Sequence, residues 1–127
     1  MHRTLIFLLT VISSSLFGQA LTVSQTQLNF GNTFETVPDS LQLTITNPST
    51  TAVDVNGIRF YKVYGQIPFS VRDSVFNLQA LASKTIWIKF SPIHNVPHNC
   101  EMVILNNSHR GNVSIDLIGQ GKYSKNY

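Results

Sequence analysis

The chain has 127 residues, with nine lysines and arginines against six acidic residues, and a single cysteine. The basic residues are scattered along the sequence, which argues against nucleic-acid binding by this domain, because such binders concentrate their charge on a patch. One cysteine cannot form an intramolecular disulfide, so the composition excludes a disulfide-stapled scaffold and predicts a fold held together by apolar packing.

The first 20 residues have the layout of a secretory signal peptide. His2 and Arg3 form a short basic start, and an apolar run follows at 5–17. This run is shorter than the roughly 20 residues that span a bilayer, which disfavours the alternatives of a membrane anchor or a first core strand. Gly18 and Ala20 supply the small residues that precede a cleavage site. We expect a secreted, periplasmic or cell-surface protein with no membrane attachment after cleavage, a domain at 21–121, and a tail or linker start at 122–127.

Alternating apolar and polar residues, interrupted by Gly, Pro and Asn, dominate the remainder of the chain. This period of two is typical of half-buried β-strands, and no stretch has competing helical periodicity. Gly57 predicts a bulge that turns Ile58 and Phe60 toward the core. The prediction is an all-β, seven-stranded antiparallel immunoglobulin-like β-sandwich. The expected strands are 21–30, 41–46, 53–61, 69–72, 85–90, 100–105 and 112–118.

The order of short motifs along the chain is similar to the ASH/major-sperm-protein-like branch of immunoglobulin-fold domains. In exported bacterial proteins the same order resembles the "choice-of-anchor D" modules. The motifs run from Leu-x-Phe-Gly near the start to Leu-x-Gly-x-Gly at the end and cover roughly residues 23–121. The matching residues are Leu28, Phe30, Gly31, Asn47, Val55, Gly57, Ile58, Pro68, Phe69, Ser70, Val71, Ile86, Ile88, Phe90, Pro92, Leu117, Gly119 and Gly121.

The resemblance implies a non-catalytic structural or protein-interaction module of an exported, bacterial protein, whose partner is another protein or a neighbouring domain. One alternative is an N-terminal accessory domain of a larger secreted enzyme, such as a nuclease or other hydrolase, with a catalytic domain after residue 127. A carbohydrate-binding module is a second alternative. A chaperone- or pilus-like subunit that pairs by strand addition is a third.

No catalytic, cofactor-binding or metal site is predicted. His94 and His98 lie four residues apart, but two prolines bracket the segment, so we expect a solvent-exposed loop. The alternative is a zinc site that would also draw on His109, Cys100 or Glu101. Nucleophile elbows and phosphate-binding glycine loops are lacking, and the carboxylates are isolated in sequence, although pairing across strands remains open.

Cys100 begins an apolar run with Met102 and Ile104, which places the three side chains on one strand face. We expect a buried core residue, the alternatives being an intermolecular disulfide or a reactive thiol.

Exposed aromatic residues form the predicted interaction surface. Trp87 is out of phase with the apolar residues of its strand, so its side chain should point away from the core. Tyr61 and Tyr64 flank a loop. Such side chains can anchor a protein partner or stack on a sugar ring, or they can pack structurally under a loop or against a neighbouring domain.

Overall fold

The computed structural model describes residues 20–62, 64–108 and 110–123, which form a two-layer β-sandwich. The signal-peptide prediction at 1–20 therefore falls almost wholly outside the described residues, as do 124–127 of the predicted tail. No helix in the described part is long and apolar enough to cross a membrane. The strands are β1 (Thr22–Val23), β2 (Gln27–Phe34), β3 (Asp39–Thr46), β4 (Val53–Tyr61), β5 (Phe69–Val71), β6 (Phe76–Leu78), β7 (Ser83–Phe90), β8 (Pro97–Asn106) and β9 (Val113–Lys122).

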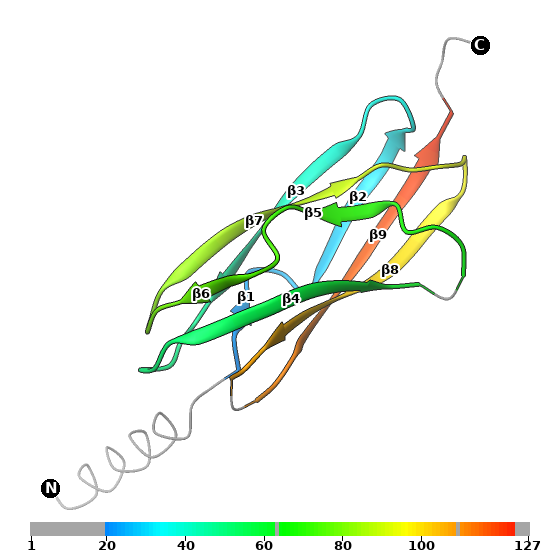
Figure 1. Cartoon of the computed structure of the whole chain (residues 1–127). Helices are drawn as coiled ribbons and strands as arrows, with labels where there is room; N and C mark the ends of the chain where they lie inside the picture. The colour runs from blue at the N-terminus through cyan, green and yellow to red at the C-terminus, as the bar shows by residue number, and fades with distance from the viewer. Residues whose placement is uncertain (1–19, 63, 109, 124–127) are drawn as a thin grey trace, which may run out of the picture.

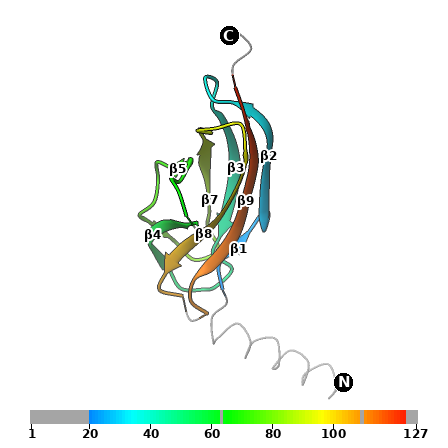
Figure 2. The same ribbon diagram turned by 90° about the vertical axis from the view of Figure 1, so that its right-hand side faces the viewer.

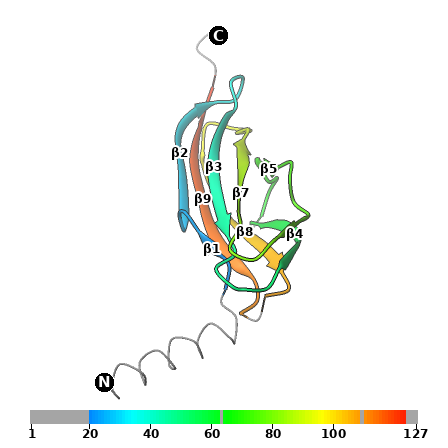
Figure 3. The ribbon, with the colours of Figure 1, turned by 90° about the vertical axis from the view of Figure 1, so that its left-hand side faces the viewer.

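The strands are divided between a four-stranded sheet in the order β1-β3-β7-β5 and a five-stranded sheet in the order β2-β9-β8-β4-β6. Figure 1 shows the two layers, with β1 at one end of the sandwich and the tip of β9 at the other. Figure 2 and Figure 3 view the same body from its two sides and show that it is elongated along its strands. The predicted immunoglobulin-like sandwich is confirmed.

The predicted number of strands, seven, is wrong: the described residues form nine. One reason is that the predicted strand 21–30 changes sheets. Ser24 still bonds to the four-stranded sheet, because its N–H donates to the Thr44 carbonyl at 2.9 Å. Two residues later, the Thr26 carbonyl accepts a bond from Asp116 N–H on β9 at 3.0 Å. The second reason is β6, whose three residues are too few to produce an alternating pattern.

The prediction of an entirely antiparallel fold is also wrong at one place, because β2 lies parallel to β9. The other pairings between the described strands are antiparallel. Side chains alternate between faces in both kinds of ladder, so the period of two in the sequence carries no information about the direction of the neighbouring strand.

The eight-residue strand β2 forms an edge of the five-stranded sheet, and its regular pairing is interrupted between Asn29 and Asn32. At this point Gly31 has a left-handed φ of 65°, and its N–H donates to Asn29 Oδ1 at 2.9 Å. Irregularities of this kind discourage an edge strand from pairing with another chain. The other three edge strands have only two or three residues each.

The core lies between the inner faces of the two sheets. Phe90 is at the centre of an aromatic cluster, with its ring 4.8 Å from that of Phe69 and 5.4 Å from that of Phe30. The predicted bulge near Gly57 is confirmed, and beyond it Ile58 and Phe60 pack partly buried against the core. The fully or nearly fully buried apolar residues are Leu21, Leu28, Phe30, Leu43, Ile45, Val53, Val55, Phe69, Leu78, Ile86, Ile88, Phe90, Cys100, Met102, Ile104, Ile115 and Leu117.

The glycines of the terminal Leu-x-Gly-x-Gly motif allow close packing at the end of the core. A Cβ on Gly119 would lie 2.5 Å from Cε2 of the Phe90 ring. A Cβ on Gly121 would collide with the backbone carbonyl of His94, which belongs to the loop between β7 and β8. The motif therefore lets β9 approach both an aromatic ring and a loop backbone that any larger residue would displace.

Candidate functional site

The three aromatic residues of the predicted interaction surface are all exposed, but they do not share one face. Trp87 is 56% exposed and belongs to β7 of the four-stranded sheet. Tyr61, 51% exposed, ends β4 in the five-stranded sheet, and Tyr64 is 83% exposed in the loop after it. The outer faces of the two sheets point in opposite directions, so the structure presents two separate surfaces, and binding at either one stays a prediction.

Trp87 is held outward by the alternation of β7, because Ile86, Ile88 and Phe90 are completely buried on the inner face. Across the sheet, Trp87 lies opposite Gln42 on β3. Next to it, Lys89 lies opposite Ser40 on one side and Ser70 of β5 on the other. Both predicted features of this residue, the strand and the outward direction, are confirmed.

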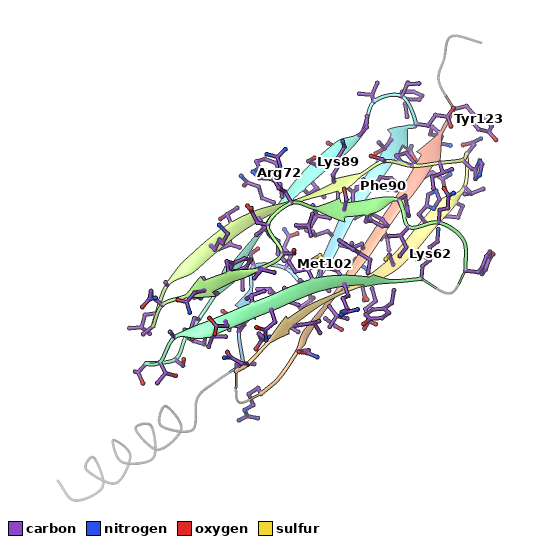
Figure 4. All side chains as sticks on the ribbon, in the orientation of Figure 1. Lys62, Arg72, Lys89, Phe90, Met102 and Tyr123 are labelled. Atoms are coloured by element: carbon purple, nitrogen blue, oxygen red, sulfur yellow. The ribbon has the colours of Figure 1, made fainter. Side chains whose placement is uncertain are left out.

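A shallow hollow of about 610 Å³ adjoins Trp87, and its rim includes Ser40, Ser70, Arg72, Asp73 and Lys89. Figure 4 labels Arg72 and Lys89 close together on this side of the molecule. The surface thus combines a broad aromatic ring with two cations, one carboxylate and two hydroxyl groups. We call these six residues the Trp87 face.

Two pairs of outward side chains on the same two strands are bonded to each other. Thr44 and Thr85 share a hydrogen bond of 2.9 Å between their hydroxyl groups, and Thr46 and Ser83 share one of 2.6 Å. The hydroxyl groups at this end of the sheet are therefore already engaged in hydrogen bonds within the sheet. The Trp87 face is therefore the part of this surface whose aromatic and charged groups are available to a partner.

A second hollow, of about 810 Å³, lies where the end of β4 meets the loops that lead into β5 and β8. Its lining includes Lys62, Tyr64, Ile93, His94, Val96 and His98. Lys62 is half-buried, and its ammonium group donates to His98 Nδ1 at 3.0 Å and to the Gln66 carbonyl at 3.2 Å. Figure 4 labels Lys62 where β4 runs into this loop region. We call this cavity the Lys62 hollow.

The prediction that His98 belongs to a solvent-exposed loop is wrong. β8 begins at Pro97, and the side chain of His98 is only 3% exposed, with its ring edge-on to Phe90 at 5.8 Å between centroids. The pKa of His98 lies below its usual value, first because burial disfavours the imidazolium and also because Lys62 and His94 lie near. The missed signal is the period of two, which runs backward from Met102 through Cys100 to His98.

His94 and His98 both line the Lys62 hollow, so the structure does bring these two residues of the zinc alternative together. Within residues 20–62, 64–108 and 110–123, however, no three His, Cys, Asp or Glu side chains gather closely enough to hold a metal ion. His109, the third histidine of that alternative, lies outside the described residues.

Cys100 is 6% exposed on the inner face of β8 together with Met102 and Ile104, which confirms its predicted place in the core. Burial raises the pKa of its thiol, an effect that the nearby backbone and Lys62 only partly oppose. A thiol in this state is a poor nucleophile, so the geometry favours the packing role over the reactive one.

Two carboxylates that are distant in sequence lie side by side on the outer face of the five-stranded sheet. Glu101 on β8 is directly opposite Asp116 on β9, and Tyr61 follows on the other side of Glu101. The Ser114 hydroxyl donates to Glu101 Oε2 at 2.8 Å. The pairing that the sequence left open therefore exists, on the exposed outer face of the sheet, beside an open hollow of about 670 Å³ that both carboxylates and Tyr61 line.

Comparison with known proteins identifies the fold. No protein-family model matches the chain, and no curated protein sequence matches it. Among solved structures, the ASH/PapD-like domain of human CEP192 (PapD-like domain 7) has a TM-score of 0.73 at 12% identity, over 86% of this chain and 89% of that one. WR4, a C. elegans member of the MSP family, has a TM-score of 0.58 at 13% identity, over 80% and 97%.

The periplasmic chaperone SfaE has a TM-score of 0.64 at 12% identity, over 81% of this chain. The chain spans 57% of that chaperone's length. At such low identities, likeness shows the fold alone. As a resemblance of fold, the similarity to ASH/major-sperm-protein-like domains is confirmed, whereas the resemblance to choice-of-anchor D modules stays a prediction.

Proposed function

We propose that this chain is a non-catalytic, immunoglobulin-like interaction module of an exported protein, and that it binds a protein partner through the Trp87 face. The observation that carries the proposal is the exposure of Trp87 beside Arg72 and Lys89, on a sheet where four of the neighbouring outward hydroxyl groups bond to one another in pairs. Tryptophan and arginine are the residues in which binding energy concentrates at protein interfaces. The fold supports this use, because one of the similar structures is a periplasmic chaperone.

Several features support binding rather than catalysis. Cys100 is buried with a raised pKa, and the paired carboxylates Glu101 and Asp116 lie on the exposed outer face of the sheet, in a hollow that is widely open to solvent. His98, whose neutral form is favoured, has its Nδ1 engaged by Lys62.

Binding by strand addition is less well supported. A strand-adding module needs a regular edge with unpaired backbone groups. β2 is the one long edge strand among the described residues, and its ladder is broken beside Gly31.

Tryptophan fluorescence provides a direct test, since Trp87 is the only tryptophan in the chain. Partners would first be captured on the wild-type protein from the extracellular or periplasmic fraction of the source cells, and the binding constant then measured with each purified partner. Burial of Trp87 on binding should shift its emission to shorter wavelength and protect it from acrylamide quenching. Trp87→Ala should weaken binding about 30-fold or more, because interface hot spots contribute at least about 2 kcal/mol.

Val75→Ala is the matched control, because Val75 is an exposed apolar residue that lies outside the Trp87 face. This substitution should leave the affinity within about twofold. Equal binding by wild type and Trp87→Ala, or an unchanged emission spectrum in the complex, would contradict the proposed surface.

The same fluorescence signal separates a protein partner from a carbohydrate. Sugars stack on exposed aromatic rings, and the serine hydroxyls of the Trp87 face could orient a saccharide. A saturable emission change with a soluble glycan, abolished in Trp87→Ala, would replace the protein partner by a carbohydrate ligand. A flat response across a glycan panel leaves the protein partner as the explanation of any complex that is captured.

Export is the remaining component of the proposal and rests on the pattern of residues 1–20. Leu21, the residue that follows the predicted cleavage site, is 3% exposed and is the first of the buried apolar residues along the described chain. Cleavage before Leu21 would therefore keep all of these core residues in the mature protein. Edman sequencing of the native extracellular product should begin at Leu21, and its intact mass would reveal any further domain, including the catalytic domain of a larger enzyme. A product that retains residues 1–20 would contradict the export prediction.

A further inference from the structure

The Lys62 hollow has the size and lining of a small-molecule site. Its volume of about 810 Å³ falls in the range of roughly 300–1,000 Å³ that is usual for ligand pockets. Most of the lining surface is apolar and comes from Ile93, Val96, Pro97 and the ring of Tyr64. The polar side chains of the lining are Lys62, Gln66, His94, His98 and Asn99. Such a lining suits a ligand with an apolar body and one polar end.

The lining of this hollow carries positive charge without a negatively charged side chain to balance it. Lys62 contributes a half-buried ammonium group, and no aspartate or glutamate is among the described residues of the lining. The two acceptors that hold the ammonium, the Gln66 carbonyl and His98 Nδ1, are both neutral groups. A lysine ammonium has three N–H donors, so one of them has no partner among the described residues. A partly buried cation held only by neutral partners favours the arrival of an anion.

His98 sets the position of the ammonium. Because the ammonium can only donate, Nδ1 must accept, and the proton of the neutral ring is therefore on Nε2. This atom is buried and has no hydrogen-bond partner among the described residues. The ring is 3% exposed and packs edge-on to Phe90, which prevents it from turning away. Lys62 is thus held by a rigid side chain, and its cost of ordering on binding an anion is small.

From these observations we infer that the Lys62 hollow binds a small organic monocarboxylate, with the carboxylate on Lys62 Nζ and the apolar body against Ile93, Val96 and Tyr64. One ammonium matches the single charge of a carboxylate. Bidentate recognition of a phosphate group favours a guanidinium fork, and the described lining of the hollow has no arginine. This site is separate from the Trp87 face, so the inference does not depend on the proposed function.

The test is a titration of the ¹⁵N-labelled purified protein with octanoate and 3-phenylpropionate, followed by two-dimensional NMR. Amide shifts should saturate and should cluster at 62, 64–66 and 93–99. Octylamine and 1-hexanol, which present a cation and a neutral group in place of the carboxylate, should bind at least about tenfold more weakly. Equal affinity for the amine or the alcohol would overturn the inference, as would the absence of a saturable response to both acids.

Substitutions locate the anion on Lys62. Lys62→Met keeps most of the side-chain volume without the charge and should weaken octanoate binding about tenfold or more, while Lys62→Arg should retain it. The matched control is Arg110→Met, which removes one exposed cation from the turn after β8, at the other end of that strand from His98, and should leave the affinity unchanged. Equal loss in both methionine variants would show a nonspecific charge effect and would overturn the assignment.

A further variant keeps the inference testable if Lys62→Met does not fold. Val96 is 43% exposed on the wall of the hollow, so Val96→Glu should fold and would place a carboxylate beside the ammonium. Octanoate binding should then be lost, whereas Val96→Gln, which removes the same apolar contact without adding a charge, should weaken it much less. Unchanged binding by Val96→Glu would place the acid elsewhere on the protein and contradict the inference.

Discussion

Gly119 provides a quantitative test of how the core of this sandwich is packed. The residue lies on β9, and a Cβ added there would meet three atoms of the Phe90 ring at 2.5, 2.8 and 3.0 Å. Comfortable carbon–carbon contacts are about 3.5–4.0 Å, so the ring would have to move by roughly 1 Å. Phe90 has no exposed surface and is stacked on Phe69, which leaves it little space for this movement.

Overpacking of this kind typically costs about 1–3 kcal/mol, so Gly119→Ala should lower the free energy of unfolding by that amount. For a domain of about 100 residues, this corresponds to a decrease in Tm of roughly 4–20 °C. Urea unfolding followed by circular dichroism, with an unchanged m-value, measures the effect. The control is Gly57→Ala, whose Cβ would meet only Leu105 at an ordinary 3.7 Å and should change stability by less than about 1 kcal/mol.

A double-mutant cycle identifies the ring as the cause. Phe90→Leu destabilises the protein by itself, because it removes buried aromatic surface, but it also vacates the volume that the methyl group added at position 119 would need. The double variant Gly119→Ala/Phe90→Leu should therefore be more stable than the sum of the two single effects, by about 1 kcal/mol or more. Strict additivity, or a Gly119→Ala variant as stable as wild type, would refute the reasoning.

Two further predictions concern buried polar groups. Asn47 is completely buried, and its Nδ2 donates to the carbonyls of Thr51 and Leu78 at 2.8 and 3.1 Å. Asn47→Ala should therefore lower the free energy of unfolding in urea by about 3 kcal/mol, against under about 1 kcal/mol for the exposed Asn107→Ala. Equal losses in the two variants would contradict this prediction. His98 has a lowered folded pKa, so the unfolded chain binds a proton first as the pH falls below about 6.5, and stability should decrease until the pH passes the folded pKa. His98→Gln should remove that part of the pH dependence, and an unchanged slope would show that other groups cause it.

The inner and outer faces of most strands could be predicted from sequence, because alternation along a strand is a local property. The burial of Ile86, Ile88 and Phe90, the exposure of Trp87 and the core position of Cys100 all follow from the period of two. The Gly57 bulge was likewise predictable, since a glycine interrupts an otherwise regular strand. Prolines were less reliable guides, because Pro97 begins β8 instead of extending the loop that was expected to contain His98.

By itself, then, the sequence determined that the chain builds a β-sandwich and which side chains fill it, because these depend on patterns within a few consecutive residues. Only the tertiary structure decided which sheet each half of 21–30 joins, that β2 runs parallel to β9, and that Tyr61 and Trp87 occupy different faces. The Lys62 hollow was likewise decided by the tertiary structure, since Lys62 and His98 are 36 positions apart and meet only because β4 pairs with β8. Contacts between distant segments depend on the direction in which strands pair and on how loops pack, and the periodicity of a strand gives no information about either.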